Sequence, residues 1–293
     1  MLFSPLACAG LKSGSAGRSR FSAASFPAVF FLIGLLPAGA VEVLVIGGGA
    51  GPTSRGDPAA FAYLQGRYGA SSVDYVEGSL STADGAVGYD VVVISSSLSS
   101  STVRNKFHNV AVPVVCWESV IVDGGGGEFG ITSTTNQTAT NHQVRISANH
   151  PITAGFSVGQ VVQICSGSID VFWGVAPDAA GKLTVAEDDG DSSRGWIKVV
   201  EQGSVLLTGG AAPARRGAVG LKNNTFKSLT ANGRLLFGQA VDWAAAGAVD
   251  PDPPVVANDP ASGVGTTFAT VGGSVVETGG INPSVTLYWG DQD

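Results

Sequence analysis

The sequence predicts an α/β fold with a doubly wound, mostly parallel sheet and an antiparallel extension. Three runs support this prediction because they are apolar at successive positions: VEVLVIGGG (41–49), DVVVISSS (90–97) and VPVVCWES (112–119). A strand that is apolar on both faces is typical of the centre of a parallel sheet covered by helices. With 293 residues, 44% hydrophobic and 13% charged, the chain can bury one large core and carry a smaller unit beside it.

The segment after the first run has the signals of a helix. Asp57 and Pro58 suit an N-cap and a first turn, and Gly69 suits the helix end. The apolar residues between them at helical spacing are Phe61, Leu64 and Tyr68. VDYVEG (73–78) is predicted to be the next strand, and we expect a further helix over about 99–109.

The middle third predicts several shorter strands that extend the sheet in an antiparallel manner. Their ranges are 143–147, 158–165, 169–175, 182–187, 196–200 and 204–210. The segment 229–247 predicts a closing helix, capped by Thr230 and ended by Gly247. We therefore expect one α/β domain over residues 41–247.

The N-terminal segment predicts export from the cell. Arg18 and Arg20 precede the apolar run FPAVFFLIGLLPAGA (26–40), which is short for a membrane span and ends in a small-x-small cleavage pattern. We expect residues 1–40 to be a signal peptide and the product to be secreted or held at the cell surface. An uncleaved membrane anchor is the alternative.

The C-terminal segment predicts a second, smaller unit. Residues 248–265 are rich in proline and aspartate, which is typical of a linker. Residues 266–293 alternate short β-rich runs with Gly-Gly and Asn-Pro turns, and they resemble part of an Ig- or fibronectin-like repeat of bacterial surface proteins. A complete sandwich of that kind needs about seven strands, so we expect a truncated copy.

Four stretches of the α/β domain resemble a known group of proteins: IGGG (46–49), CWES (116–119), NHPITAGF (149–156) and the run 214–244. Together they resemble the class I glutamine-amidotransferase-like superfamily, and within it the ThuA-like (trehalose-utilisation-like) domains of secreted bacterial proteins. The resemblance implies a flavodoxin-like sheet. It also implies a Cys nucleophile on a strand-to-helix elbow, a His from a later strand and an orienting carboxylate.

The sequence departs from that catalytic pattern. Cys116 lies two residues before the elbow position, where Glu118 stands, so we expect its thiol to be buried and unreactive. The histidines are His108, His142 and His150, and none lies in the later part of the domain where the triad histidine belongs. The Cys-His-Glu triad is not evident.

Polar residues at the carboxyl ends of the strands form the candidate site, because ligands of open α/β sheets bind there. Glu118 and His150 are the candidate catalytic residues, as a general acid and base acting together. The candidate ligand contacts are Gly48, Gly49, Ser96, Trp117 and Arg215. In the structural alternative, Glu118 caps the next segment, His150 fixes the turn before Pro151, and Arg215 forms an internal salt bridge.

Charge and motifs exclude several classes of partner. The formal net charge of −7 disfavours nucleic acid, and we expect no membrane partner after signal cleavage. We expect no cofactor, since IGGGAG (46–51) lacks the G-x-G-x-x-G spacing. We expect no metal, since there is no CxxC pair, and EDDGD (187–191) lacks the rest of a calcium loop.

Two classes of function remain. The first is a non-catalytic module that binds carbohydrate or a cell-surface protein through the strand-end cleft, with an exposed aromatic such as Trp117 or Trp173. The second is a hydrolase that uses Glu118 and His150 in one shared cavity.

Overall fold

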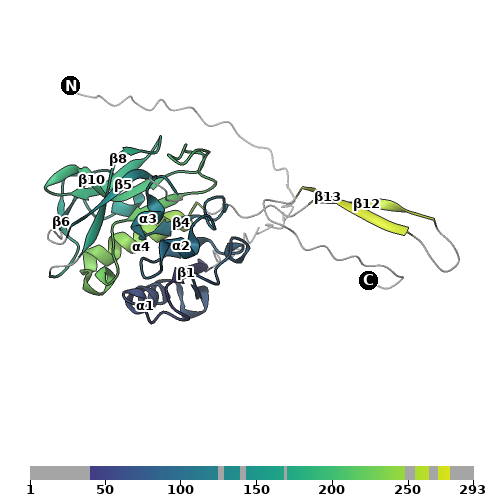
Figure 1. The fold of residues 1–293 in the computed structure, drawn as a ribbon, viewed down its shortest axis with the longest axis horizontal. Helices are drawn as coiled ribbons and strands as arrows, with labels where there is room; N and C mark the ends of the chain where they lie inside the picture. Colours follow the sequence, from purple (N-terminus) through teal and green to yellow (C-terminus); the bar gives the residue numbers. More distant parts are fainter. Residues whose placement is uncertain are drawn as a thin grey trace, which may run out of the picture. The chain divides into compact units, whose positions relative to one another are not determined.

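The structure is a computed structural model that describes residues 40–124, 129–138, 143–167, 170–247, 255–263 and 270–277. The predicted signal peptide lies outside the described residues, apart from Ala40. Figure 1 shows the arrangement of the main sheet and its helices.

One half of the eleven-stranded main sheet is parallel, in the order β2-β1-β3-β4-β11. These strands are β1 (Val43–Gly47), β2 (Val73–Glu77), β3 (Val91–Ile94), β4 (Val114–Cys116) and β11 (Arg216–Val219). Every residue of β1, β3 and β4 is buried, as a central strand covered on both faces requires. The order corresponds to the 2-1-3-4-5 arrangement of flavodoxin-like sheets, so the prediction of a parallel α/β core is confirmed.

The other half is antiparallel and continues from β11 in the order β10-β9-β6-β7, with β8 pairing with both β10 and β5. These strands are β5 (Thr132–Thr138), β6 (Gln143–Ile146), β7 (Val161–Gln163), β8 (Val171–Asp178), β9 (Leu183–Asp188) and β10 (Asp191–Val200). The predicted extension is therefore present. Threonine-rich β5 was not predicted, because it shows no apolar alternation.

Two long helices, α1 (Asp57–Tyr68) and α4 (Ala231–Ala245), pack against one another. Arg67 of α1 forms an ion pair with Asp242 of α4, and the Tyr63 hydroxyl donates to the backbone oxygen of Arg234 at 2.8 Å. The side chain of Thr230 caps α4 by accepting from the Gly233 N–H at 3.2 Å, as predicted. The short helical segments are α2 (Ser100–Val103), α3 (Ser119–Val122), η1 (Ala70–Ser72), η2 (Asp84–Ala86), η3 (Pro151–Thr153) and η4 (Thr225–Ser228).

Two predicted elements are wrong. The helix expected over 99–109 is limited to the single turn α2, because Arg104 leaves the helical region at ψ 133° and Asn105 has φ 66°. The strand expected over 204–210 is a loop, because Gly209 and Gly210 have φ of 91° and 78° and turn the chain back on itself.

Near the C-terminus, β12 (Val255–Ser262) and β13 (Thr270–Glu277) form an antiparallel hairpin, drawn in yellow in Figure 1. β12 lies within the range expected to be a linker (248–265), because its Val255–Val256 pair begins a strand directly after the prolines. β13 lies within the predicted partial Ig- or fibronectin-like segment, and residues 278–293 lie outside the described residues.

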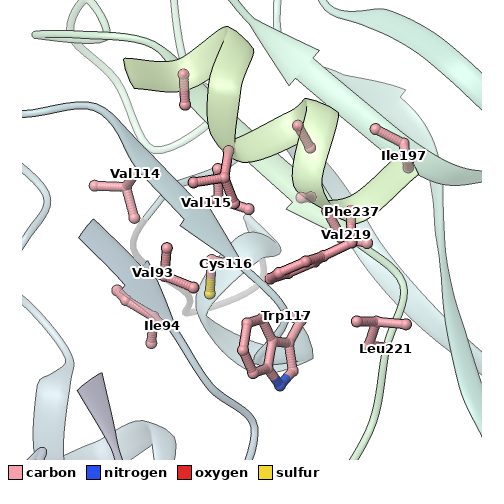
Figure 2. Close-up of a cluster of buried hydrophobic side chains, with 14 of the residues drawn as sticks. Val93, Ile94, Val114, Val115, Cys116, Trp117, Ile197, Val219, Leu221 and Phe237 are labelled. Atoms are coloured by element: carbon pink, nitrogen blue, oxygen red, sulfur yellow. The ribbon is translucent and has the colours of Figure 1, made fainter. Parts of the chain in front are cut away.

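The core around β4 determines the surroundings of Cys116. Figure 2 shows Cys116 and Val93 among buried strand side chains, with Trp117 beside Phe237 of α4. The Trp117 and Phe237 rings meet edge to face, with their centroids 5.3 Å apart. Cys116 has no exposed surface, and the Glu118 N–H lies 3.4 Å from its sulfur. Cys116 and Cys165 are both buried and not joined in a disulfide, and the burial of Cys116 agrees with the prediction.

A chain that keeps Cys116 as its sole cysteine should resist thiol reagents in the folded state, because the thiol has no path to solvent without opening of the sheet. Labelling followed by mass spectrometry in buffer and in denaturant measures this. The same reagent should react at once after unfolding. Rapid labelling in buffer, with the unfolding transition unchanged, would contradict the burial of this thiol.

Candidate functional site

A cavity of about 300 Å³ lies at the carboxyl ends of the parallel strands. Its walls come from the loops that follow β1, β3, β4 and β11, which is where ligands of open α/β sheets bind. The lining residues are Arg55, Ser96, Leu98, Ser99, Ser100, Trp117, Glu118, Ser119, Val120, Lys222 and Asn223. Three predicted site residues meet here: Ser96, Trp117 and Glu118.

Behind this cavity, the carboxylate of Asp57 holds two of the loops in place. Asp57 has no exposed surface and accepts hydrogen bonds from the hydroxyls of Ser95, Ser97 and Tyr75. The Tyr75 and Ser97 contacts measure 2.8 Å and 2.5 Å. Asp57 was predicted to be the N-cap of α1. In the structure the N-cap is Gly56, and Asp57 is the first residue of the helix. Three hydroxyl donors offset the cost of burying this carboxylate.

The two glycines predicted to bind ligand instead pack against this network. The Gly48 N–H donates to the Ser97 hydroxyl at 2.8 Å, and a Cβ at Gly48 would lie 2.3 Å from the Ser97 carbonyl oxygen. The Gly49 N–H points to the Tyr75 hydroxyl at 3.5 Å. Neither glycine lines the cavity. Both glycines allow close backbone approach, and ligand contact by Gly48 and Gly49 stays a prediction.

Ser96 lies between the two serines that bind Asp57, and it lines the cavity. Its side chain is buried, and its hydroxyl has no hydrogen-bond partner. Its backbone oxygen accepts from the Arg55 guanidinium at 3.1 Å. A buried hydroxyl without a partner costs stability, and this one belongs to a residue that lines the cavity.

Arg55 enters the cavity from the loop between β1 and α1. Its backbone has φ 50°, which is unfavourable for a residue with a side chain. Asn223 holds it there, since the Arg55 guanidinium donates to the Asn223 side-chain oxygen and the Gly56 N–H donates to the Asn223 backbone oxygen at 2.9 Å. Such strained residues cluster at binding sites.

Glu118 lines the cavity as a half-buried carboxylate. Burial raises its pKa from the ordinary value of 4.5 to about 7, against the opposing effects of the Val120 N–H, Lys222 and Arg55. Glu118 occupies the N-cap position of α3, but its side chain makes no capping hydrogen bond. The Val120 N–H, at the second position of α3, nevertheless lowers the pKa of Glu118, so the capping alternative stays open.

The tryptophans expected to offer an exposed ring are both buried. Trp117 is 2% exposed and Trp173 has no exposed surface. The Trp117 ring packs between Phe226 and Phe237, so it forms the apolar floor of the cavity and not a stacking platform on the surface. The expectation of an exposed aromatic at these two positions is wrong.

His150 does not line this cavity. Its ring lies 5.5 Å from that of Trp243, and its Nδ1 accepts from the Ile152 N–H at 3.2 Å, which caps η3. Burial lowers the pKa of His150, with nearby Arg215 acting in the same direction and Glu201 opposing it. His150 therefore fixes the turn before Pro151, as the structural alternative predicted, and does not share a site with Glu118.

Arg215 also lies away from the cavity. It immediately precedes β11, so it lies at the amino end of a parallel strand, on the edge opposite the strand-end loops. It forms an ion pair with Glu201 at 2.7 Å and donates to the Trp243 backbone oxygen at 2.6 Å. The internal salt bridge of the structural alternative is present, and ligand contact by Arg215 stays a prediction.

The acidic turn 187–191 carries paired charges. Asp188 and Asp191 contact Arg194, and Asp189 contacts Arg145.

Within the part of the chain that the structure describes, no group of three or more histidine, cysteine or acidic side chains is arranged to hold a metal ion. The described residues also include no helix with the length and apolar character to cross a membrane.

Four important residues were missed by sequence reasoning: Arg55, Asp57, Lys222 and Asn223. Lys222 and Asn223 follow β11, and the rule that strand ends carry the site could have found them. Arg55 and Asp57 offered no comparable signal, because the triplet RGD (55–57) matches a helix start equally well.

Comparison with known proteins gives structural likeness alone. No family model and no curated protein matches the sequence. A ThuA-like protein from Bacteroides uniformis is similar in structure, at 14% identity and a TM-score of 0.47, over 75% of this chain and 95% of that one. The mmIFT52 N-terminal domain is similar at 10% identity and a TM-score of 0.47, over 71% of this chain and 100% of that one.

Replacing Glu118 with glutamine should stabilise the protein at pH 8 and have little effect at pH 5. The folded-state pKa of Glu118 is raised, so its contribution is present below pH 4.5 and lost as pH rises through about 7. Glutamine cannot ionise and avoids that loss, which we expect to be roughly 1–2 kcal/mol after solvent screening. Urea unfolding at the two pH values measures it.

Glu77→Gln, at the end of β2 and outside the cavity, is the matched control for the pH series. Equal changes in the free energy of unfolding for both variants, at both pH values, would show that Glu118 is not desolvated as the structure places it.

Proposed function

We propose that this chain is a non-catalytic binding module that holds a small, hydroxyl-rich ligand of the carbohydrate class in the strand-end cavity. The observation that supports it most directly is the polar lining of the cavity, which includes Ser96, a residue whose buried hydroxyl lacks a hydrogen-bond partner. A ligand hydroxyl can both donate to and accept from such a group.

The rest of the lining supports the same chemistry. Four serines, an asparagine, a carboxyl group and two cationic side chains surround the space, with Trp117, Leu98 and Val120 as the apolar part. A volume of about 300 Å³ lies at the lower end of small-molecule sites, so it suits one or two sugar units better than a protein surface. We place the module outside the cell because of the apolar run 26–40.

A hydrolase is the second candidate, favoured by one observation. The pKa of Glu118, raised to about 7 by burial, suits a general acid or base near neutral pH. His150 does not act as a partner of Glu118 in this cavity, because its side chain caps η3. A hydrolytic role would therefore depend on Glu118 without a histidine partner.

Ser96→Ala tests the binding proposal. It should leave stability unchanged or slightly higher, since it removes a buried group without a partner, and it should weaken binding of the strongest sugar on a glycan array by about five- to tenfold. His150→Ala is the control: loss of the cap should lower stability by about 1 kcal/mol and leave sugar affinity unchanged. Titration calorimetry and thermal unfolding measure both.

The proposal fails if no glycan binds, or if Ser96→Ala binds the sugar as wild type does. Turnover of ester, amide or glycoside substrates that is lost in Glu118→Gln would favour the hydrolase instead.

A further inference from the structure

We propose that the ligand of the strand-end cavity carries a carboxylate, received by the side chains of Arg55 and Lys222, and is therefore an acidic sugar of the uronate class. This inference rests on the proposed function and specifies its ligand. It follows from the charges of the cavity and from how Arg55 is held.

Two cationic side chains and one carboxyl group line the cavity. Arg55 comes from the loop after β1, Lys222 from the loop after β11, and Glu118 from the loop after β4. The charged groups that act on Glu118 are Lys222, Arg55 and, more weakly, Asp123. Whenever Glu118 is protonated, the lining carries an excess of positive charge, which an anionic ligand would balance.

Arg55 differs from the arginines that form ion pairs, and it shares this with the buried Arg216, which backbone oxygens hold. Arg67, Arg145, Arg194 and Arg215 each form an ion pair with an aspartate or glutamate. Among the residues that the structure describes, none forms such a pair with Arg55. Its guanidinium is held by two neutral acceptors, the Ser96 carbonyl and the Asn223 side chain.

Neutral acceptors position a guanidinium without cancelling its charge. The hydrogen bonds of Arg55 to Ser96 and Asn223 use the same nitrogen, Nη1, which leaves the donors of Nε and Nη2 for a second partner. A planar carboxylate matches that fork in a bidentate manner, whereas a neutral sugar hydroxyl does not. The strained backbone at Arg55 is consistent with a side chain held ready for binding.

Glu118 makes this binding depend on pH. Below about pH 7 it is protonated and can donate a hydrogen bond to a ligand carboxylate; above that pH its own charge repels the ligand and competes for the two cations. The affinity for an acidic sugar should therefore fall as pH rises through 7, while a neutral sugar should show no such dependence.

The test compares D-glucuronate with D-glucose, which differ only in the oxidation of one carbon, by titration of the full chain at pH 6 and pH 8. Glucuronate should bind at least tenfold more tightly than glucose at pH 6, and about tenfold more weakly at pH 8 than at pH 6. Glu118→Gln should abolish the pH dependence, because glutamine stays neutral.

Matched variants locate the carboxylate. Lys222→Gln and Arg55→Gln should each lower glucuronate affinity about tenfold and lower glucose affinity by a much smaller factor. Lys227→Gln and Arg104→Gln, exposed positions outside the cavity, are the controls and should change neither affinity. Arg55→Lys, which keeps the charge, should recover part of the loss and also shows that the loop still folds.

The outcomes distinguish a failure of this inference from a failure of the proposed carbohydrate-binding function on which it rests. Equal affinity for glucose and glucuronate, or tight binding of neutral glycans alone, would overturn the acidic ligand and leave the carbohydrate module standing. Inorganic phosphate or acetate binding as tightly as glucuronate would also overturn it, by showing a general anion site without sugar recognition. Failure of every glycan to bind would contradict both the acidic-sugar ligand and the carbohydrate-binding function.

Discussion

The buried carboxylate of Asp57 is the interaction on which the strand-end region depends. A charged group with no exposed surface is tolerated only where donors surround it, and Ser95, Ser97 and Tyr75 supply three. These donors come from β2 and from the loop after β3, while Asp57 itself begins α1. One side chain therefore ties α1, β2 and the loop after β3 together.

This constraint explains how the cavity is shaped. Because Ser95 and Ser97 turn toward Asp57, the residue between them faces another way, and Ser96 becomes part of the cavity wall. Its carbonyl oxygen then holds Arg55, which lies two residues before Asp57. A structural network and a candidate binding site are thus built from alternate residues of the same loops. The other charged residues of the cavity wall, Glu118 and Lys222, come from farther along the chain.

The sequence predicted those features that depend on local patterns. The continuous apolar runs identified β1, β3 and β4, and Thr230 identified the start of α4, because burial on both faces and helix capping leave clear marks in neighbouring residues. The range 132–138 escaped because its threonines pair with β8 without any apolar alternation. Polar strands of this kind are stabilised by partners that the sequence does not reveal.

The site was predicted in part for the same reason. Glu118, Ser96 and Trp117 were found because they follow apolar strands. Arg215 and His150 were misplaced, because their position depends on strand direction and on Trp243, which lies far away in sequence. Asp57 matched a helix cap locally, and its true partners are 18 to 40 residues distant. Long-range hydrogen bonds of a buried charge cannot be inferred from spacing.

The most direct test of this account is native-state amide hydrogen exchange in wild type and in Asp57→Asn. The account predicts faster exchange concentrated at Gly48 and Ser97, whose backbone N–H groups lie in this network, together with a loss of roughly 2–4 kcal/mol in the free energy of unfolding. Amides of the antiparallel strands β9 and β10 should retain their relative protection. Unchanged exchange at Gly48 and Ser97, with stability near that of wild type, would contradict the claim that Asp57 holds the strand-end loops.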